Sequence, residues 1–404
     1  MSRITLTEHR PVLLELSQAD QQQLDRLRFD LRPDFHGGGV WVNAGSTAGV
    51  LLLPSGTVLE IRPKVPLRNL LWMLSSVHHL NVRYLDETVP LERFEDLLEC
   101  IARFFTELVE QQLDMGLYRN YVEFEGNTAS VRGRIVIAED LRQNLILRQR
   151  TWCRYAEFTW DLPENQVIRQ VIQQLAGWGF GGGLTSRLIA LDMQLAEITP
   201  SYFTSQDIDR FVYNRQSRTY ESIHRICRLF LDDESLGEQA GSVHFNGFLV
   251  NMDSLFESFV SQEVRRRLRL PHVLHLQYQT ALDERGSLSI RPDLVVTYAG
   301  MPVYIADCKY KKLDTGSHLH GDIYQMLAYA TVLGLDEGLL VYPRHENVIE
   351  GELRVKHSPV TIRETTLDLS QSVSLIERAL DNLAERMTGL KGTEATSHPC
   401  ADQQ

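Results

Sequence analysis

The sequence predicts a multidomain protein that mixes helices and strands (α+β or α/β). We expect an N-terminal β-rich domain, a middle region of helices and strands, and a C-terminal mixed sheet flanked by helices. The chain has 404 residues, which suggests two or three domains. Its composition, 43% hydrophobic and 23% charged, is ordinary for a globular protein. The spacing of apolar residues changes along the chain between two-residue and three- to four-residue steps, which predicts both strands and helices.

Residues 1–90 are typical of short strands broken by turns. Val58, Glu60 and Arg62 alternate with Leu59 and Ile61, as expected of half-buried strands. Residues 69–80 are compatible with one short helix. We therefore interpret 1–90 as a β-rich domain.

Residues 91–240 are interpreted as a middle, connecting region. Apolar residues recur at three- and four-residue steps over 91–115, which predicts an amphipathic helix with a buried stripe. A strand pattern returns over 118–160. Helices are expected at 163–195 and 206–232, separated by the glycine cluster 179–183 and by Pro200. The polar segment 233–248 is a plausible connection between domains.

Residues 241–388 show a different succession of helix and strand patterns, and we interpret them as a third domain. A helix is expected over 253–270, capped by Asp253 or Ser254. Strands at 273–282, 288–298 and 302–310 follow, then a helix at 318–334, a strand at 338–342 and a helix at 371–387. Residues 389–404 are expected to form a disordered tail.

Charge and composition exclude several classes of protein. The formal charge is -12, which argues against a protein that coats nucleic acid nonspecifically, although the middle third of the chain is net basic. The five cysteines are scattered, without zinc-like spacing, and a disulfide framework is improbable. No apolar run approaches the roughly 20 residues that cross a bilayer, and the first ten residues lack an apolar signal core. We therefore expect a cytoplasmic protein without membrane contact.

The chemistry-bearing segment combines Pro292-Asp293 with Asp307-Cys308-Lys309. Two strands joined in a hairpin would bring Asp293 and Asp307 side by side, where the carboxylates repel one another unless a cation neutralises them. Two carboxylates, water and a substrate phosphate suit Mg²⁺. Lys309 lies two residues beyond Asp307 and therefore projects from the same face of the strand. A Lewis-acid metal beside a cation meets the requirements of phosphodiester hydrolysis.

This motif alone is weak, because a solvated Asp–Lys pair on an edge hairpin explains it equally well. Two further positions strengthen it. Glu257, on the upstream helix, is placed to reach the metal directly or through water, although a surface carboxylate is the simpler alternative. Gln325 and Tyr329 share one face of the following helix, where Gln325 has the alternative of a structural amide. The order of helix, three strands, helix and strand resembles the PD-(D/E)xK nuclease fold.

The chain up to its tail resembles the McrC family, the nuclease subunits of the McrBC modification-dependent restriction systems. The matching strings are LEIRPKV (59–65), VRGRI (131–135), CRYAEFTWDLPENQ (153–166), MDSLFESFV (252–260), RPDLVV (291–296), IADCKYKK (305–312) and DIYQMLAYA (322–330). The resemblance implies an endodeoxyribonuclease in which Asp293, Asp307 and Glu257 hold Mg²⁺, Lys309 is the catalytic lysine, and Glu257 and Gln325 are the flanking motif positions.

The resemblance also implies a partner, a McrB-like hexameric AAA+ GTPase. In the family this ring binds the GTP, reads modified cytosine in DNA, and receives an amino-terminal β-rich region of McrC in its pore. Consistently, this sequence has no Gly-Lys-Ser/Thr phosphate loop. The sequence does not decide whether two complexes pair to cut both strands. It also leaves two alternative functions: a non-cleaving adaptor that activates a ring NTPase, and a nuclease with another partner or substrate, such as RNA.

Overall fold

The computed structural model describes residues 2–34, 37–79, 91–146, 149–231, 247–310, 318–344 and 351–388. The chain forms two compact units, the first made of residues 1–94 and 249–404 and the second of residues 95–248. Our interpretation of the sequence treated residues 1–90 and 241–388 as separate domains, whereas the structure packs them into one unit. The predicted connection 233–248 lies mostly, and the predicted tail 389–404 entirely, outside the described residues.

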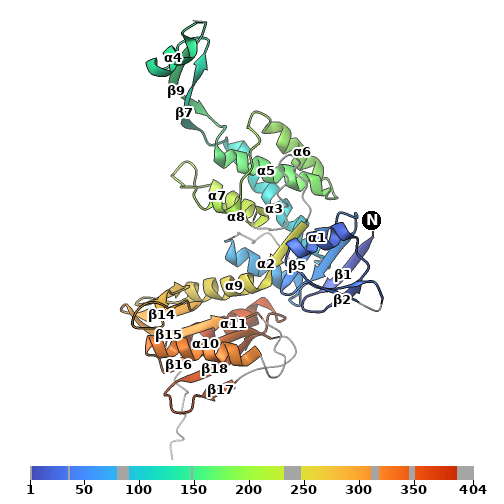
Figure 1. Cartoon of the computed structure of the whole chain (residues 1–404), viewed down its shortest axis with the longest axis vertical. Coiled ribbons are helices and arrows are strands. Elements are labelled where there is room, and N and C mark those ends of the chain that lie inside the picture. The colour runs from blue at the N-terminus through green and yellow to red at the C-terminus, as the bar shows by residue number, and fades with distance from the viewer. Residues whose placement is uncertain are drawn as a thin grey trace, which may run out of the picture. The chain divides into compact units, whose positions relative to one another are not determined.

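The N-terminal part of the first unit contains two sheets, as the strand pattern predicts (Figure 1). One has the order β1 (Arg3–Thr7), β6 (Val58–Arg62), β5 (Thr47–Leu52) and β10 (Gly247–Asn251), so its last strand comes from far along the chain. The other joins β2 (Val12–Leu14), β4 (Val40–Asn43) and β3 (Asp30–Pro33) in antiparallel pairs. Leu6, Leu24, Val42, Leu51 and Leu59 belong to the core of this region.

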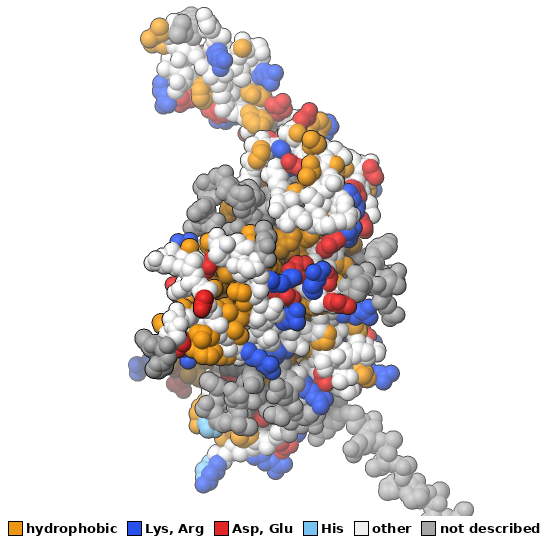
Figure 2. Space-filling view, turned by 90° about the vertical axis from the view of Figure 1, so that its right-hand side faces the viewer, with side chains coloured by type: hydrophobic (Ala, Val, Ile, Leu, Met, Phe, Trp, Pro, Cys, Tyr) orange, Lys and Arg blue, Asp and Glu red, His pale blue; other side chains and the backbone are white. Residues whose placement is uncertain are grey.

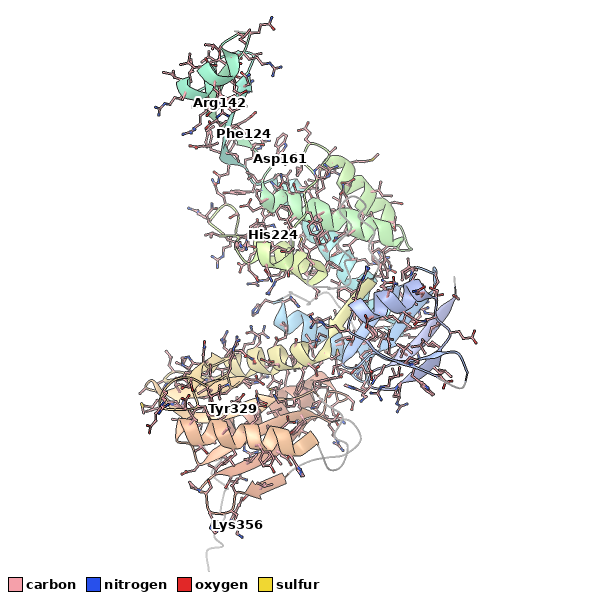
Figure 3. All side chains as sticks on the ribbon, viewed as in Figure 1. Phe124, Arg142, Asp161, His224, Tyr329 and Lys356 are labelled. Atoms are coloured by element: carbon pink, nitrogen blue, oxygen red, sulfur yellow. The ribbon has the colours of Figure 1, made fainter. Side chains whose placement is uncertain are left out.

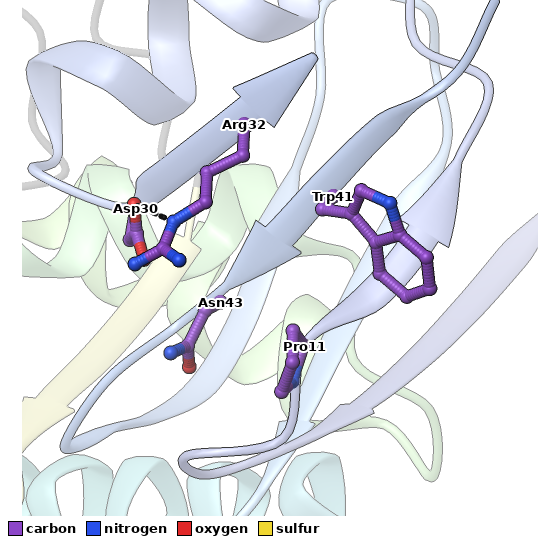
Figure 4. A pocket seen from close by; sticks show the side chains of 5 residues that line it. All are labelled: Pro11, Asp30, Arg32, Trp41 and Asn43. Atoms are coloured by element: carbon purple, nitrogen blue, oxygen red, sulfur yellow. Dashed lines mark hydrogen bonds and ion pairs between the residues drawn. The ribbon is translucent and has the colours of Figure 1, made fainter. Parts of the chain in front are cut away.

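Two helices accompany these sheets. The first, α1 (Gln18–Arg26), was not expected from the apolar pattern, but a capping box formed by Ser17 and Asp20 starts it. The second, α2 (Leu67–Val77), confirms the short helix expected near residues 69–80. A pocket of about 280 Å³ lies on the three-stranded sheet, where Trp41 and Pro11 line it together with Asp30, Arg32 and Asn43 (Figure 4).

The C-terminal part of the first unit is a six-stranded mixed sheet. Its order is β11 (His272–Leu276), β14 (Leu294–Tyr298), β15 (Met301–Cys308), β16 (Glu337–Pro343), β18 (Thr361–Leu367) and β17 (Gly351–Arg354). Strands β11, β14 and β15 pair antiparallel, whereas β15, β16 and β18 run parallel. A separate two-stranded ribbon joins β12 (Thr280–Ala281) and β13 (Ser289–Ile290). The mixed sheet expected for this region is therefore present.

Three helices cover this sheet. Helix α10 (His318–Leu333) packs on one face through Met326, Tyr329 and Ala330, which share a core cluster with Val295 and Ile305. Helices α9 (Met252–Arg267) and α11 (Val373–Met387) pack against each other and against the sheet. The N-cap of α9 corrects the sequence prediction, because the side chain of Asn251, and not Asp253 or Ser254, accepts the hydrogen bond that starts the helix.

Helix α2 ties the two parts of the first unit together by packing on α9. Ser76 of α2 donates a hydrogen bond to Glu263 of α9. Asn69 Nδ2 donates to the carbonyl of Leu369 at 2.7 Å. Just after β15, Tyr310 is buried, and burial followed by the charge of Glu8, which follows β1, raises the pKa of its hydroxyl. Buried polar contacts of this kind fix two surfaces in one arrangement, since each lost partner leaves a desolvated group behind.

The second unit is helical, with a protruding β-hairpin. Its helices are α3 (Phe94–Met115), α5 (Pro163–Trp178), α6 (Leu184–Gln194), α7 (Ser205–Ile208) and α8 (Tyr220–Leu231). They confirm the helical periodicity over 91–115 and 163–195 and the break at glycines 179–183. The continuous helix expected over 206–232 is wrong, because residues 209–219 between α7 and α8 are not helical. Strands β7 (Asn120–Thr128) and β9 (Thr151–Thr159) pair over nine residues, and β8 (Arg134–Ile135) and α4 (Ile137–Asn144) lie between them in sequence. Figure 1 shows the hairpin extending away from the helices of its own unit.

No helix among the described residues combines the length and the apolar character that a membrane span requires.

Candidate metal-dependent active site

The pairing of β14 with β15 brings the two predicted aspartates together. Leu294 lies opposite Ala306, so one step further along the ladder places Asp293 opposite Asp307. The Cys308 N–H donates to Asp293 Oδ2 at 3.2 Å, which ties the first aspartate to the strand that carries the second. Because side chains alternate along a strand, both carboxyl groups share the sheet face that α10 covers.

Asp307 is a buried carboxyl group with an incomplete set of partners. Its side chain is 2% exposed, and Oδ1 accepts no hydrogen bond from any described residue. Burial, and next the charge of Asp293, raise the pKa of Asp307 to about 7, although Lys309 opposes this shift. A buried oxygen with free lone pairs beside a second carboxylate is a position that favours a cation.

Lys309 supplies the positive charge of the site. Its Nζ lies 2.6 Å from Asp307 Oδ2, and its backbone N–H donates to the carbonyl of Val341 on β16 at 3.0 Å. Burial acts to lower the pKa of Lys309, but attraction to Asp307 and then to Asp293 outweighs burial and raises it. The ammonium group therefore stays protonated and is held at the end of β15, on the face that the sequence predicts.

Glu257 joins the site through an amide that the sequence analysis did not single out. The side chain of Gln277, just after β11, donates one hydrogen bond to Glu257 Oε1 and another to Asp293 Oδ1, the latter at 3.1 Å. Glu257 comes from the half-buried side of α9. No short motif marks Gln277, because its position depends on the pairing of β11 with β14.

Gln325 lies at the edge of the site rather than among the carboxylates. Its side chain is exposed, and its Nε2 donates to the hydroxyl of Tyr329 at 2.6 Å. Tyr329 on α10 is 6% exposed (Figure 3). Burial raises its pKa, and the charges of Asp307 and Asp293 contribute to the shift, so the hydroxyl lies within electrostatic reach of both. The expected pairing of positions 325 and 329 on one helix face is therefore present.

The donor set fits a hard divalent cation. Among the described residues no three His, Cys, Asp or Glu side chains already form a metal-binding group, and Glu257 is joined to Asp293 through Gln277. Mg²⁺ needs no such cage, because it typically binds one or two carboxylates and keeps water or substrate phosphate as its other ligands. Asp293 together with the unpartnered Oδ1 of Asp307 meets this requirement.

Two of the three arginines in the last turn of α9 are engaged in ion pairs. Arg266 and Arg267 contact Glu263 at 2.8 and 2.5 Å, and Arg267 also contacts Asp381 at 2.6 Å. These contacts favour a structural role for both side chains over a DNA-facing one. Lys311 and Lys312, beyond Lys309, lie outside the described residues.

A family model described as "McrBC 5-methylcytosine restriction system component" matches residues 42–343, about three quarters of the chain. The chain belongs to the McrBC family. This confirms the family expected from the sequence strings, and the match extends over Glu257, Asp293, Asp307, Lys309 and Gln325. Among curated proteins, no relative matches this McrBC family chain.

One solved structure has a fold similar to that of this chain. This structure, described as a refined half-complex from a tetradecameric assembly of Thermococcus gammatolerans McrB AAA+ hexamers with bound McrC, has 17% identity and a TM-score of 0.60. The alignment covers 95% of this chain and 100% of that chain. The Thermococcus gammatolerans McrBC complex has 18% identity and a TM-score of 0.44, with 66% of this chain and 88% of that chain covered.

Proposed function

We propose that this chain is the McrC-type nuclease subunit of a restriction system and that it cleaves DNA by Mg²⁺-dependent phosphodiester hydrolysis. The observation that carries the proposal is the convergence of Asp293, Asp307 and Lys309 at the paired ends of β14 and β15. A second support is the C-terminal mixed sheet with helices packed on it, the architecture expected for this part of the chain.

Each side chain has a separate role in the proposed reaction. Asp293 and Asp307 would hold Mg²⁺, with Glu257 as a nearby third carboxylate. When bound, Mg²⁺ supplies Lewis-acid polarisation of the phosphate and makes water a better nucleophile. Lys309, kept protonated by Asp307, is placed to stabilise the negative charge that develops on the phosphate. Gln325 and Tyr329 would contact the substrate from α10.

The partner in this proposal is a hexameric AAA+ GTPase. The Thermococcus gammatolerans assembly, described as McrB AAA+ hexamers with bound McrC, supports it by its similar fold. The ring would bind GTP, recognise modified cytosine and act on DNA together with this chain in the cytoplasm. Two such complexes meeting on DNA would let one chain cut each strand.

The hairpin of the second unit is the surface that we propose for contact with the ring. Its exposed apolar side chains stand among arginines and are visible at the top of Figure 2. They are Tyr121, Phe124, Val131, Ile135, Ile137, Leu141, Leu145, Ile146 and Phe158, of which Ile146 is 92% exposed. Apolar patches of this kind mark protein–protein contacts. Residues 1–90, the β-rich domain that the family resemblance implies for insertion into the ring, stay the other proposed contact surface.

A non-cleaving adaptor is the second candidate. It would use the same hairpin and leave the C-terminal sheet as support. The raised pKa of Asp307 disfavours it, because an inert sheet gains nothing from burying a carboxyl group beside another.

The test compares Lys309→Ala with Lys356→Ala, which removes an exposed lysine away from the site (Figure 3). Each purified variant is mixed with its AAA+ partner, GTP, Mg²⁺ and modified DNA, and both cleavage and GTP hydrolysis are measured. We expect Lys309→Ala to lower cleavage at least about 100-fold while GTPase stimulation stays unchanged. Lys356→Ala should match the wild type in both assays. Wild-type-like cleavage by Lys309→Ala would exclude the assigned role, and GTPase stimulation without cleavage by the wild type would favour the adaptor.

A further inference from the structure

Gln277 connects two carboxylates that come from different elements. Its Nε2 donates to Glu257 Oε1 on α9 and, at 3.1 Å, to Asp293 Oδ1 before β14. Asp293 Oδ2 accepts the N–H of Cys308. Both oxygens of Asp293 are thus oriented by N–H donors, and each keeps a second lone pair for another partner.

The backbone of Gln277 is shaped for this contact. Its φ is +50°, in the left-handed region, which costs a residue other than glycine roughly 1–2 kcal/mol. The residue is nevertheless fixed in register, since its N–H donates to the carbonyl of Asp293 at 2.9 Å and the Tyr278 N–H donates to that of Pro292 at 3.0 Å. The ladder between β11 and β14 therefore continues past the end of β11, and the unusual conformation turns the amide toward the carboxylates.

The physical problem at this point is repulsion between like charges. Glu257 and Asp293 both contact the amide of Gln277, and two carboxylates without a donor between them move apart. That movement would separate the oxygens that a cation needs. An amide that gives one N–H to each carboxylate opposes it without adding charge.

We propose that Gln277 is a positioning residue, which holds Glu257 and Asp293 side by side so that their free lone pairs can receive a divalent cation. This inference rests on the proposed nuclease function and deepens it. Gln277 itself touches neither the cation nor the substrate in this arrangement. Outer partners of metal ligands typically contribute 10- to 100-fold to metal affinity or activity.

The experiment uses Gln277→Met, which keeps the length of the side chain and removes both donors. Gln279→Met is the matched control, because Gln279 is exposed and its side-chain hydrogen bond among the described residues goes to Ser289 Oγ, at 3.4 Å. Binding of Mn²⁺, a spectroscopic substitute for Mg²⁺, is titrated by electron paramagnetic resonance on the full chain without DNA or partner. Cleavage with the AAA+ partner is then followed as a function of Mg²⁺ concentration.

We expect Gln277→Met to weaken Mn²⁺ binding and to raise the half-saturating Mg²⁺ concentration, each by 10- to 100-fold. The cleavage rate at saturating Mg²⁺ should recover to within about tenfold of the wild type, whereas loss of a catalytic group or of the fold would lower it at every concentration. Gln277→Asn keeps an amide that is one methylene shorter and tolerates the left-handed backbone, so its affinity should fall between the two. Gln279→Met should behave as the wild type.

Unchanged Mn²⁺ affinity and unchanged Mg²⁺ dependence in Gln277→Met would overturn the inference and leave the proposed nuclease function intact. If Gln277→Met does not fold, Gln277→Asn decides in its place, and wild-type affinity there counts against the inference. If the wild type and the Gln279→Met control neither bind Mn²⁺ nor cut DNA, the proposed function fails, and the role of Gln277 falls with it.

Discussion

Replacing Asp307 by asparagine should stabilise the metal-free protein while abolishing its cleavage. The pKa of Asp307 rises from 3.8 to about 7 because the group is buried and then because Asp293 is close. In the unfolded chain the same carboxyl group ionises above about pH 4. Ionisation of Asp307 in the fold therefore costs up to about 4 kcal/mol at pH 7 and above, taking 1.36 kcal/mol per pKa unit.

The sign of the pH dependence follows from the direction of this shift. The folded state holds the Asp307 proton more tightly, so the wild type loses stability as the pH rises from about 4 to about 7. Asparagine does not titrate and avoids this loss. The advantage of Asp307→Asn should be up to about 4 kcal/mol at pH 8 and less than half of that at pH 5.

Hydrogen exchange of the β14 and β15 amides in EDTA measures this difference locally, without requiring the two units to unfold together. Asp336→Asn, at an exposed aspartate next to β16, is the matched control and should show no gain. Mg²⁺ should then stabilise the wild type by about 1.4 kcal/mol for each tenfold excess over its Kd, and Asp307→Asn much less. Lower protection of Asp307→Asn at pH 8, or an equal difference at pH 5 and pH 8, would refute the reasoning.

Three further predictions concern the surrounding structure. Burial raises the pKa of Glu8 to about 7, so Glu8→Gln should raise the melting temperature at pH 8 more than at pH 5, and a gain independent of pH would contradict this. Gly133 has φ +62°, and a Cβ added there would lie 2.5 Å from a backbone oxygen of β9. Gly133→Ala should therefore make the hairpin more sensitive to limited proteolysis. Gly126→Ala is the control and should leave the sensitivity unchanged, because a Cβ there meets no neighbouring atom. Asn69→Ala should cost about 1–3 kcal/mol in chemical denaturation, because it leaves the buried carbonyl of Leu369 without its donor, and a loss below 0.5 kcal/mol would argue against that contact.

Local patterns in the sequence predicted much of the C-terminal fold. Alternation of apolar residues around 291–296 and 303–307 predicts two strands, and a turn between them brings Asp293 and Asp307 side by side. Their exact register also depends on a β-bulge that the sequence did not predict. The bulge at Val296/Thr297 shifts the ladder by one residue and places Asp293 opposite Asp307 instead of Ala306. Lys309 follows from the two-residue period. These placements depend on short-range geometry, and the β14–β15 pairing confirms them.

The remaining features depend on contacts between distant segments. Gln277 reaches the site only because β11 pairs with β14 in one register and continues for one more residue in a left-handed conformation. Helix α1 was missed because its apolar stripe is short, although the capping residues Ser17 and Asp20 are a usable signal. The exposed apolar residues of the hairpin, such as Tyr121 and Phe158, follow the pattern of an ordinary half-buried strand. Only the structure shows that their second face is uncovered.

Strand β10 has a consequence for biosynthesis. The sheet that begins with β1 takes its edge strand from residues 247–251, which the ribosome adds after the whole second unit. At 5–20 residues per second, the N-terminal strands wait roughly 10–40 s for that neighbour, with one edge of β5 open in the meantime. The helices of the second unit are all synthesised before β10. The second unit can therefore fold first, and the N-terminal sheet gains its last strand afterwards.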